Sequence, residues 1–89
     1  MSRENRLREV IEKGNKFQEI IENEVFRETI KLTEQRICKE WQEAQTTQER
    51  ESKWYLLQAL KTLLMELRIP VAEKHLALQE MSQLDQEWE

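Results

Sequence analysis

The stretch WQEAQTTQERESKWYLLQAL, residues Trp41 to Leu60, decides how the chain folds. It has a tryptophan near each end, a Thr-Thr pair between them, and mostly good helix formers elsewhere. Thr46, followed three residues later by Glu49, matches the capping-box pattern. In that pattern the hydroxyl accepts from a backbone N–H, and the glutamate reaches back to the N–H of the cap residue itself. We therefore expect a turn at residues 45–47 between two helices.

The two helices beside this turn are predicted from apolar residues at helical spacing. The first helix is expected over residues 24–44 and the second over residues 48–68. Their apolar stripes are Phe26, Ile30, Thr33, Ile37 and Trp41 in the first, and Leu56, Leu57, Leu60, Leu63, Leu64 and Leu67 in the second. A turn this short makes neighbouring helices antiparallel. We therefore predict a hairpin whose tip is clasped by Trp41 and Trp54.

Two outer segments, 2–23 and 70–88, are expected to form accessory helices. Ser2 is a predicted N-cap, and Gly14 is a break signal inside an apolar stripe that continues in phase, so the first segment is one helix with a weak point or two short helices. Pro70 allows either a fourth helix or a kinked continuation of the third. The predicted fold is all-α: one domain, 1–89, in which a core hairpin, 24–68, and the accessory helices form a small bundle.

The composition excludes several classes of protein. The chain has 89 residues, 38% hydrophobic and 36% charged, with one Gly and one Pro. This is too apolar for a disordered chain and too poor in turn residues for a sheet protein. A single cysteine, Cys38, cannot form an internal disulfide and fits a reducing compartment. No apolar run suggests a signal peptide or a membrane span, so we expect a cytoplasmic protein without membrane contact.

Catalytic chemistry is not predicted. His75 is the single histidine, and neither it nor Cys38 has a partner at metal-ligand or nucleophile–base spacing. The carboxylates of Glu19, Glu22 and Glu24 point to different sides of a helix. The one glycine excludes a Gly-rich phosphate loop. We expect no enzyme activity, no metal, no cofactor and no small-molecule substrate.

A basic arm near the start raises the possibility of nucleic-acid binding. Arg3, Arg6 and Arg8 lie within two helical turns and could contact phosphates. Glu4 and Glu9 partly neutralise them, and the net charge of the chain is −4. We favour a solvated helix face over a phosphate-binding arm.

Apolar surface exceeds what one small hairpin can bury. A chain of this size buries only about 60% of the surface that its unfolded form exposes. We therefore expect a homo-oligomer or a helical protein partner. The expected interface residues are Leu56, Leu60, Leu63, Leu67, Met81, Leu84 and Trp88. The alternative is that the accessory helices cover the third helix and the protein is a monomer.

Residues 17–67 resemble small helical proteins encoded by tailed bacteriophages. The resemblance is carried by NEVF (23–26), Ile37 and Trp41, the threonine-containing turn, and ERESKWYLLQALKTLLMEL (49–67). It implies a non-catalytic virion-assembly or adaptor protein, located in the host cytoplasm or the virion, and it does not cover the segment after Pro70. The alternatives are an oligomeric DNA-packaging subunit that uses the basic arm, and an acidic inhibitor of a host enzyme.

Overall fold

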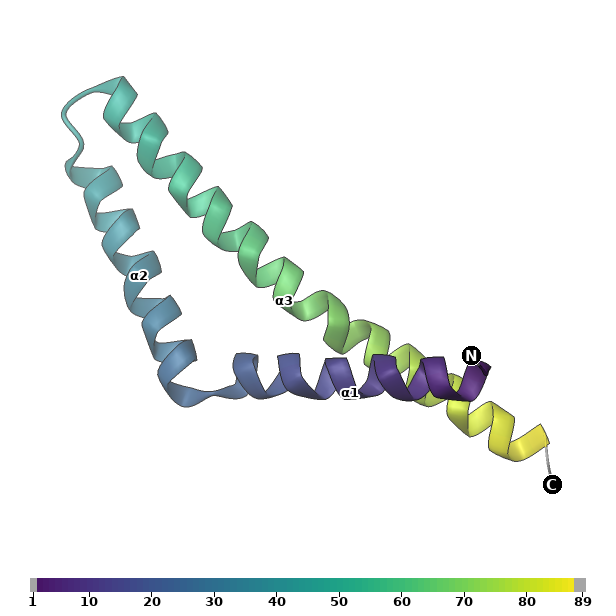
Figure 1. The fold of residues 1–89 in the computed structure, drawn as a ribbon. Helices are drawn as coiled ribbons and strands as arrows, with labels where there is room; N and C mark the ends of the chain where they lie inside the picture. The colour runs from purple at the N-terminus through teal and green to yellow at the C-terminus, as the bar shows by residue number, and fades with distance from the viewer. Residues whose placement is uncertain (1, 88–89) are drawn as a thin grey trace. The chain divides into compact units, whose positions relative to one another are not determined.

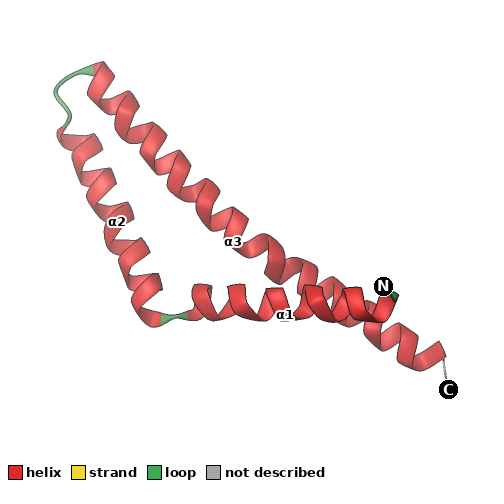
Figure 2. Cartoon of the chain, viewed as in Figure 1, coloured by secondary structure: helices red, strands yellow, loops and turns green. Residues whose placement is uncertain are grey.

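The computed structural model describes residues 2–87, in which three α-helices are joined by two short connections (Figures 1 and 2). Helix α1 spans Arg3–Glu22, α2 spans Glu24–Glu43 and α3 spans Thr47–Glu87. No strand occurs among these residues. The all-α prediction is therefore confirmed.

Polar side chains cap the first two helices at their start. Ser2 Oγ accepts a hydrogen bond from the backbone N–H of Asn5 at 3.1 Å. Asn23 Oδ1 accepts one from the N–H of Phe26 at 2.9 Å. Each bond satisfies a donor that has no partner inside its own helix. The predicted N-cap at Ser2 is confirmed, and Asn23, which caps α2, alone separates α1 from α2.

The start of α3 follows the predicted capping pattern with one correction. Thr46 Oγ1 accepts from the N–H of Glu49 at 3.1 Å, as expected. The Glu49 carboxylate, however, accepts at 2.8 Å from the N–H of Gln45 and not from that of Thr46. Gln45 lies outside the helix in an irregular connection. The return bond can therefore reach one residue further back and hold the connection itself.

The helices are grouped in two compact units. Unit 1 consists of Met1–Ile21 and Glu66–Glu89, and unit 2 consists of Glu22–Met65. Helix α3 contributes to both, with its first part in unit 2 and its second part in unit 1. The predicted single domain, 1–89, stays a prediction, since the contacts define these two groups.

Helix α1 runs without interruption through Gly14, so one helix is present and not two short ones. Gly14 is buried in unit 1. A Cβ atom built on it would overlap the Cβ of Lys74 and lie 2.8 Å from the carbonyl oxygen of Pro70. Glycine is therefore required for a close approach of two helix backbones, and it does not mark a break.

Helix α3 also runs without interruption, through Pro70 to Glu87. The separate accessory helix predicted over 70–88 is therefore the second part of α3, and Trp88 lies outside the described residues. Proline has no N–H, so the carbonyl of Glu66 loses its usual partner in the helix. Pro70 is buried in unit 1, where its carbonyl faces Gly14. We attribute the continuity of the helix to this packing, which offsets part of the cost of the proline.

Unit 2 has no residue that is fully buried. The positions that are least exposed recur every three or four residues along α2 and the first part of α3, which is the spacing of a helix–helix seam. The positions with this spacing are Phe26, Ile30, Thr33, Ile37, Glu40, Lys53, Leu57, Leu60 and Leu64, and Cys38, Ala44 and Gln58 are partly exposed as well. Two helices alone thus leave every seam position of this unit in partial contact with solvent.

Candidate protein-interaction surfaces

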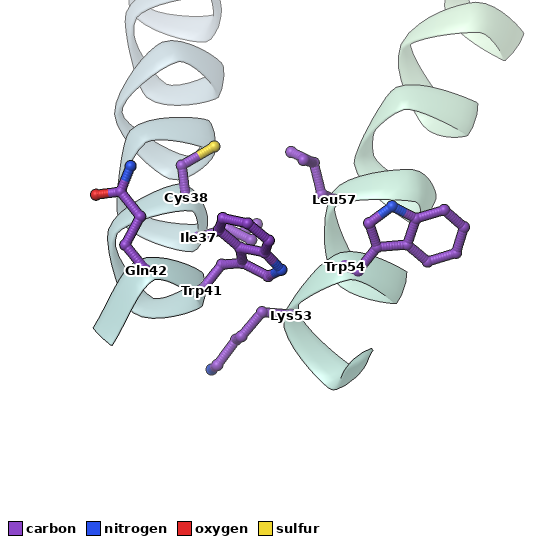
Figure 3. A pocket seen from close by; sticks show the side chains of 7 residues that line it. All are labelled: Ile37, Cys38, Trp41, Gln42, Lys53, Trp54 and Leu57. Atoms are coloured by element: carbon purple, nitrogen blue, oxygen red, sulfur yellow. The ribbon is translucent and has the colours of Figure 1, made fainter. Parts of the chain in front are cut away.

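A cavity of about 270 Å³ lies between α2 and α3, next to the connection that joins them (Figure 3). Its walls come from both helices and are largely hydrocarbon. They are formed by Ile37, Cys38, Trp41, Gln42, Lys53, Trp54 and Leu57. We call the side of unit 2 that carries these residues the cavity face.

The two tryptophans predicted to clasp the hairpin tip both line this cavity. Figure 3 shows the Trp41 side chain between the two helices, whereas the Trp54 ring points away from α2. The Trp54 ring instead makes an edge-on contact with Tyr55, with ring centroids 5.3 Å apart. Trp41 is 45% exposed and Trp54 is 50% exposed. The two residues therefore share one cavity without stacking on each other.

An ion pair joins the two helices beside the cavity. Lys53 Nζ lies 2.6 Å from a carboxylate oxygen of Glu40. The hydrogen bond from Lys53, assisted by its positive charge, lowers the pKa of Glu40 below its ordinary value. Both residues occupy seam positions, where a polar pair specifies the register of the helices. This pair was not predicted, because a lysine inside an apolar stripe does not indicate which acidic residue it contacts.

A second apolar surface lies on another side of α3. Leu56 and Leu63 are each about half exposed, while Leu60 is less exposed. Leu63 follows Trp54 by nine residues, which is two and a half turns at 3.6 residues per turn, so the two residues lie on opposite sides of the helix. We call Leu56, Leu60 and Leu63 the leucine face. It is distinct from the cavity face.

The remaining predicted interface residues belong to unit 1. Leu67 is partly exposed, and Met81 and Leu84 border a shallow hollow together with Ser2 and Arg3. The core of this unit contains Leu7 and Ala77, which are 9% and 3% exposed. Unit 1 therefore contains buried apolar side chains, whereas unit 2 contains none.

Polar contacts also hold unit 1 together. Lys74 Nζ donates to Gln18 Oε1 at 2.6 Å in a partly buried position. Arg3 pairs with Glu80 at 3.4 Å on the surface. The buried role of Ala77 and the Lys74–Gln18 bond were not predicted. The sequence pattern that could have indicated them is a lysine, Lys74, followed three residues later by a small residue, Ala77.

The arginines of the basic arm have acidic neighbours. Arg3 pairs with Glu80, and Arg8 pairs with Glu4 at 2.8 Å. Arg6 borders a hollow that Glu80 also lines. The positive potential that these arginines could offer to a phosphate is thus reduced by carboxylates within the same unit.

Other reactive groups do not converge among residues 2–87. His75 is exposed, and Cys38 is half-buried in the cavity wall. No group of three His, Cys, Asp or Glu side chains in this range could hold a metal ion. No helix in the described part is apolar over the length that a membrane span needs.

No family model, curated protein or solved structure matches the chain. The two apolar surfaces of unit 2 are the features from which a function can be proposed.

Proposed function

We propose that the chain is a non-catalytic helical assembly protein. In this proposal α2 and the first part of α3 form an antiparallel hairpin, and the leucine face buries against helices of another copy. One observation carries it: unit 2 has no fully buried residue, although leucines recur along the first part of α3. Helices of another copy would supply the missing half of its core.

The leucine face would contribute part of the free energy that an association needs. Burying a whole leucine side chain contributes about 1.5–3 kcal/mol. Leu56 and Leu63 are 50% and 51% exposed, so covering the exposed halves of both contributes about 1.5–3 kcal/mol per copy. Leu60 lies between them and would add to this as its remaining surface is covered.

Electrostatics does not oppose contact between identical copies of this unit. Residues 22–65 carry seven basic and eight acidic side chains, a net charge of −1. Repulsion between two such units is small, and it is screened further at physiological ionic strength. A second copy of the chain is therefore an acceptable partner for the leucine face.

Virion assembly in a tailed bacteriophage is the context that we propose, on the sequence resemblance alone. A DNA-packaging role for the Arg3, Arg6 and Arg8 arm gains no support from the ion pairs of Arg3 and Arg8. An acidic inhibitor role gains none from the nearly balanced charge of unit 2. We therefore retain assembly as the proposal.

The test is the mass of the protein in solution, measured by light scattering after size-exclusion chromatography. The double variant Leu56→Ala/Leu63→Ala is expected to form smaller particles than the wild type. Leu76→Ala is the matched control, since Leu76 is an exposed leucine on α3 outside the leucine face. An unchanged mass for the double variant, or a loss of mass equal to that of the control, would overturn the proposal.

A further inference from the structure

We propose that the cavity face is a second self-association surface, at which two copies of the chain pack face to face with α2 of each copy on α3 of the other. This goes beyond the proposed function, because Trp54 of the cavity face lies on the opposite side of α3 from Leu63 of the leucine face. The occupant is a second copy of this chain, placed by twofold symmetry. Three features of the cavity face support it.

The first feature is a hollow and a projecting ring on one surface. The cavity between α2 and α3 has about 270 Å³ of open volume. Trp54 is one of the residues that line it, is 50% exposed, and directs its ring away from α2 (Figure 3). In a twofold contact each surface meets its own copy. In this contact α2 of each copy would cover the exposed Trp54 ring of the other.

The second feature is the apolar area that remains to be covered. An aromatic side chain buries about 150–250 Å² when it is fully covered. Trp41 and Trp54 are about half exposed, so their remaining area is roughly 200 Å² per copy. A stable interface needs about 800 Å² from each partner. The two tryptophans supply about a quarter of this at the centre, where the residues that dominate binding energy are found.

The third feature is a complementary pair of charges at the edge of the face. Glu34 precedes Cys38 by four residues, and Lys61 follows Leu57 by four residues, so each lies on the cavity side of its helix. Both side chains are exposed. When α2 of one copy lies on α3 of the other, the acid at the edge of one faces the base at the edge of the other. The face is therefore complementary to itself.

The two surfaces together predict three different particle masses among four proteins. Wild type is expected to exceed a dimer, because each copy would bind others through both faces. Leu56→Ala/Leu63→Ala should leave dimers held by the cavity face. Trp54→Ala should leave dimers held by the leucine face, with the dissociation constant of the cavity contact raised about tenfold or more. The triple variant should be a monomer.

These masses show whether the leucine face, the cavity face or both mediate association. If only the cavity face associates, the wild type is a dimer, Trp54→Ala is a monomer, and the leucine variant is unchanged. If Trp54→Ala has the same mass as the wild type while its circular dichroism is unchanged, the cavity face is not an association surface. If Trp54→Ala fails to fold, the charge-reversal variants of Glu34 and Lys61 test the cavity face instead.

The charged pair provides a test that does not depend on the tryptophan. In the background Leu56→Ala/Leu63→Ala, both Glu34→Lys and Lys61→Glu should weaken dimers, because each places like charges opposite one another. A mixture of the two variants should restore dimers, since in the mixed pair both contacts again join opposite charges. Such a rescue requires contact between copies. A mixture that stays as dissociated as its components would overturn the twofold arrangement.

Discussion

Gly14 of α1 lies directly against the carbonyl oxygen of Pro70 in α3, so closely that a Cβ atom at position 14 would be 2.8 Å from that oxygen. The one glycine and the one proline of the chain thus meet at a single point. Each would be read locally as a helix breaker, and each lies within a continuous helix. The contact between them makes unit 1 sensitive to both residues.

Gly14→Ala is expected to destabilise the protein. Alanine is favoured over glycine inside a helix by about 1 kcal/mol, but the added methyl overlaps Lys74 and the carbonyl of Pro70. Forcing extra volume into a packed contact costs about 1–3 kcal/mol. Because backbone must move here, we expect a net loss of about 1 kcal/mol in urea denaturation followed by circular dichroism. Asn15→Ala, at an exposed position of the same helix, should instead be neutral or slightly stabilising.

Pro70→Ala is expected to stabilise α3. Proline inside a helix costs about 3 kcal/mol relative to alanine. Removing two buried methylene groups costs about 0.8 kcal/mol each, which leaves a net gain of about 1.4 kcal/mol. The restored N–H at position 70 can donate to the carbonyl of Glu66. Thermal denaturation measures the gain, and a lower melting temperature would show that packing of the proline ring at Gly14 outweighs the hydrogen bond.

Thr46→Ala is expected to weaken the start of α3. Its hydroxyl accepts from the N–H of Glu49, and replacing such an N-cap by alanine costs about 0.5–2 kcal/mol. The variant Thr47→Ala is the control, because Thr47 is already inside the helix. Amide hydrogen exchange should show faster exchange in the first turn of α3 for Thr46→Ala alone. Equal exchange in both variants would contradict the role of this cap.

Glu40→Gln is expected to change how stability depends on pH. Lys53 holds the pKa of Glu40 below its ordinary value, so the ion pair contributes stability above the ordinary carboxylate pKa. This contribution is lost as pH falls through the lowered pKa in the folded protein. Wild type should therefore be more stable than Glu40→Gln near neutral pH, and the two should converge in acid. A constant difference across this range, measured by urea denaturation, would exclude the pair as its source.

Most local features of the fold could be predicted from the sequence. The starts of α1 and α2 at Ser2 and Asn23, and the cap of α3 at Thr46, depend on hydrogen bonds between residues three apart. The apolar stripes likewise follow from the helical period. The return bond of Glu49 to Gln45 was misplaced by one residue, because the conformation of an irregular connection is not contained in a residue pattern.

The candidate surfaces could be predicted only in part. The leucine face was expected from residue spacing, and Leu56 and Leu63 are each about half exposed. Its role as an interface stays a prediction. The cavity and the outward direction of the Trp54 ring were not expected. Rotamers at a helix surface depend on the neighbouring helix, which a sequence stripe does not describe.

The sequence by itself determined that the chain is helical, where its helices begin, and which of their sides are apolar, because these properties arise between residues a few positions apart. Only the tertiary structure decided that α1 and α3 continue through Gly14 and Pro70. Local propensity counts a glycine and a proline as costs. In the tertiary structure α1 and α3 pack closely at these two residues. Because Gly14 has no side chain, the backbone carbonyl of Pro70 can lie directly against α1.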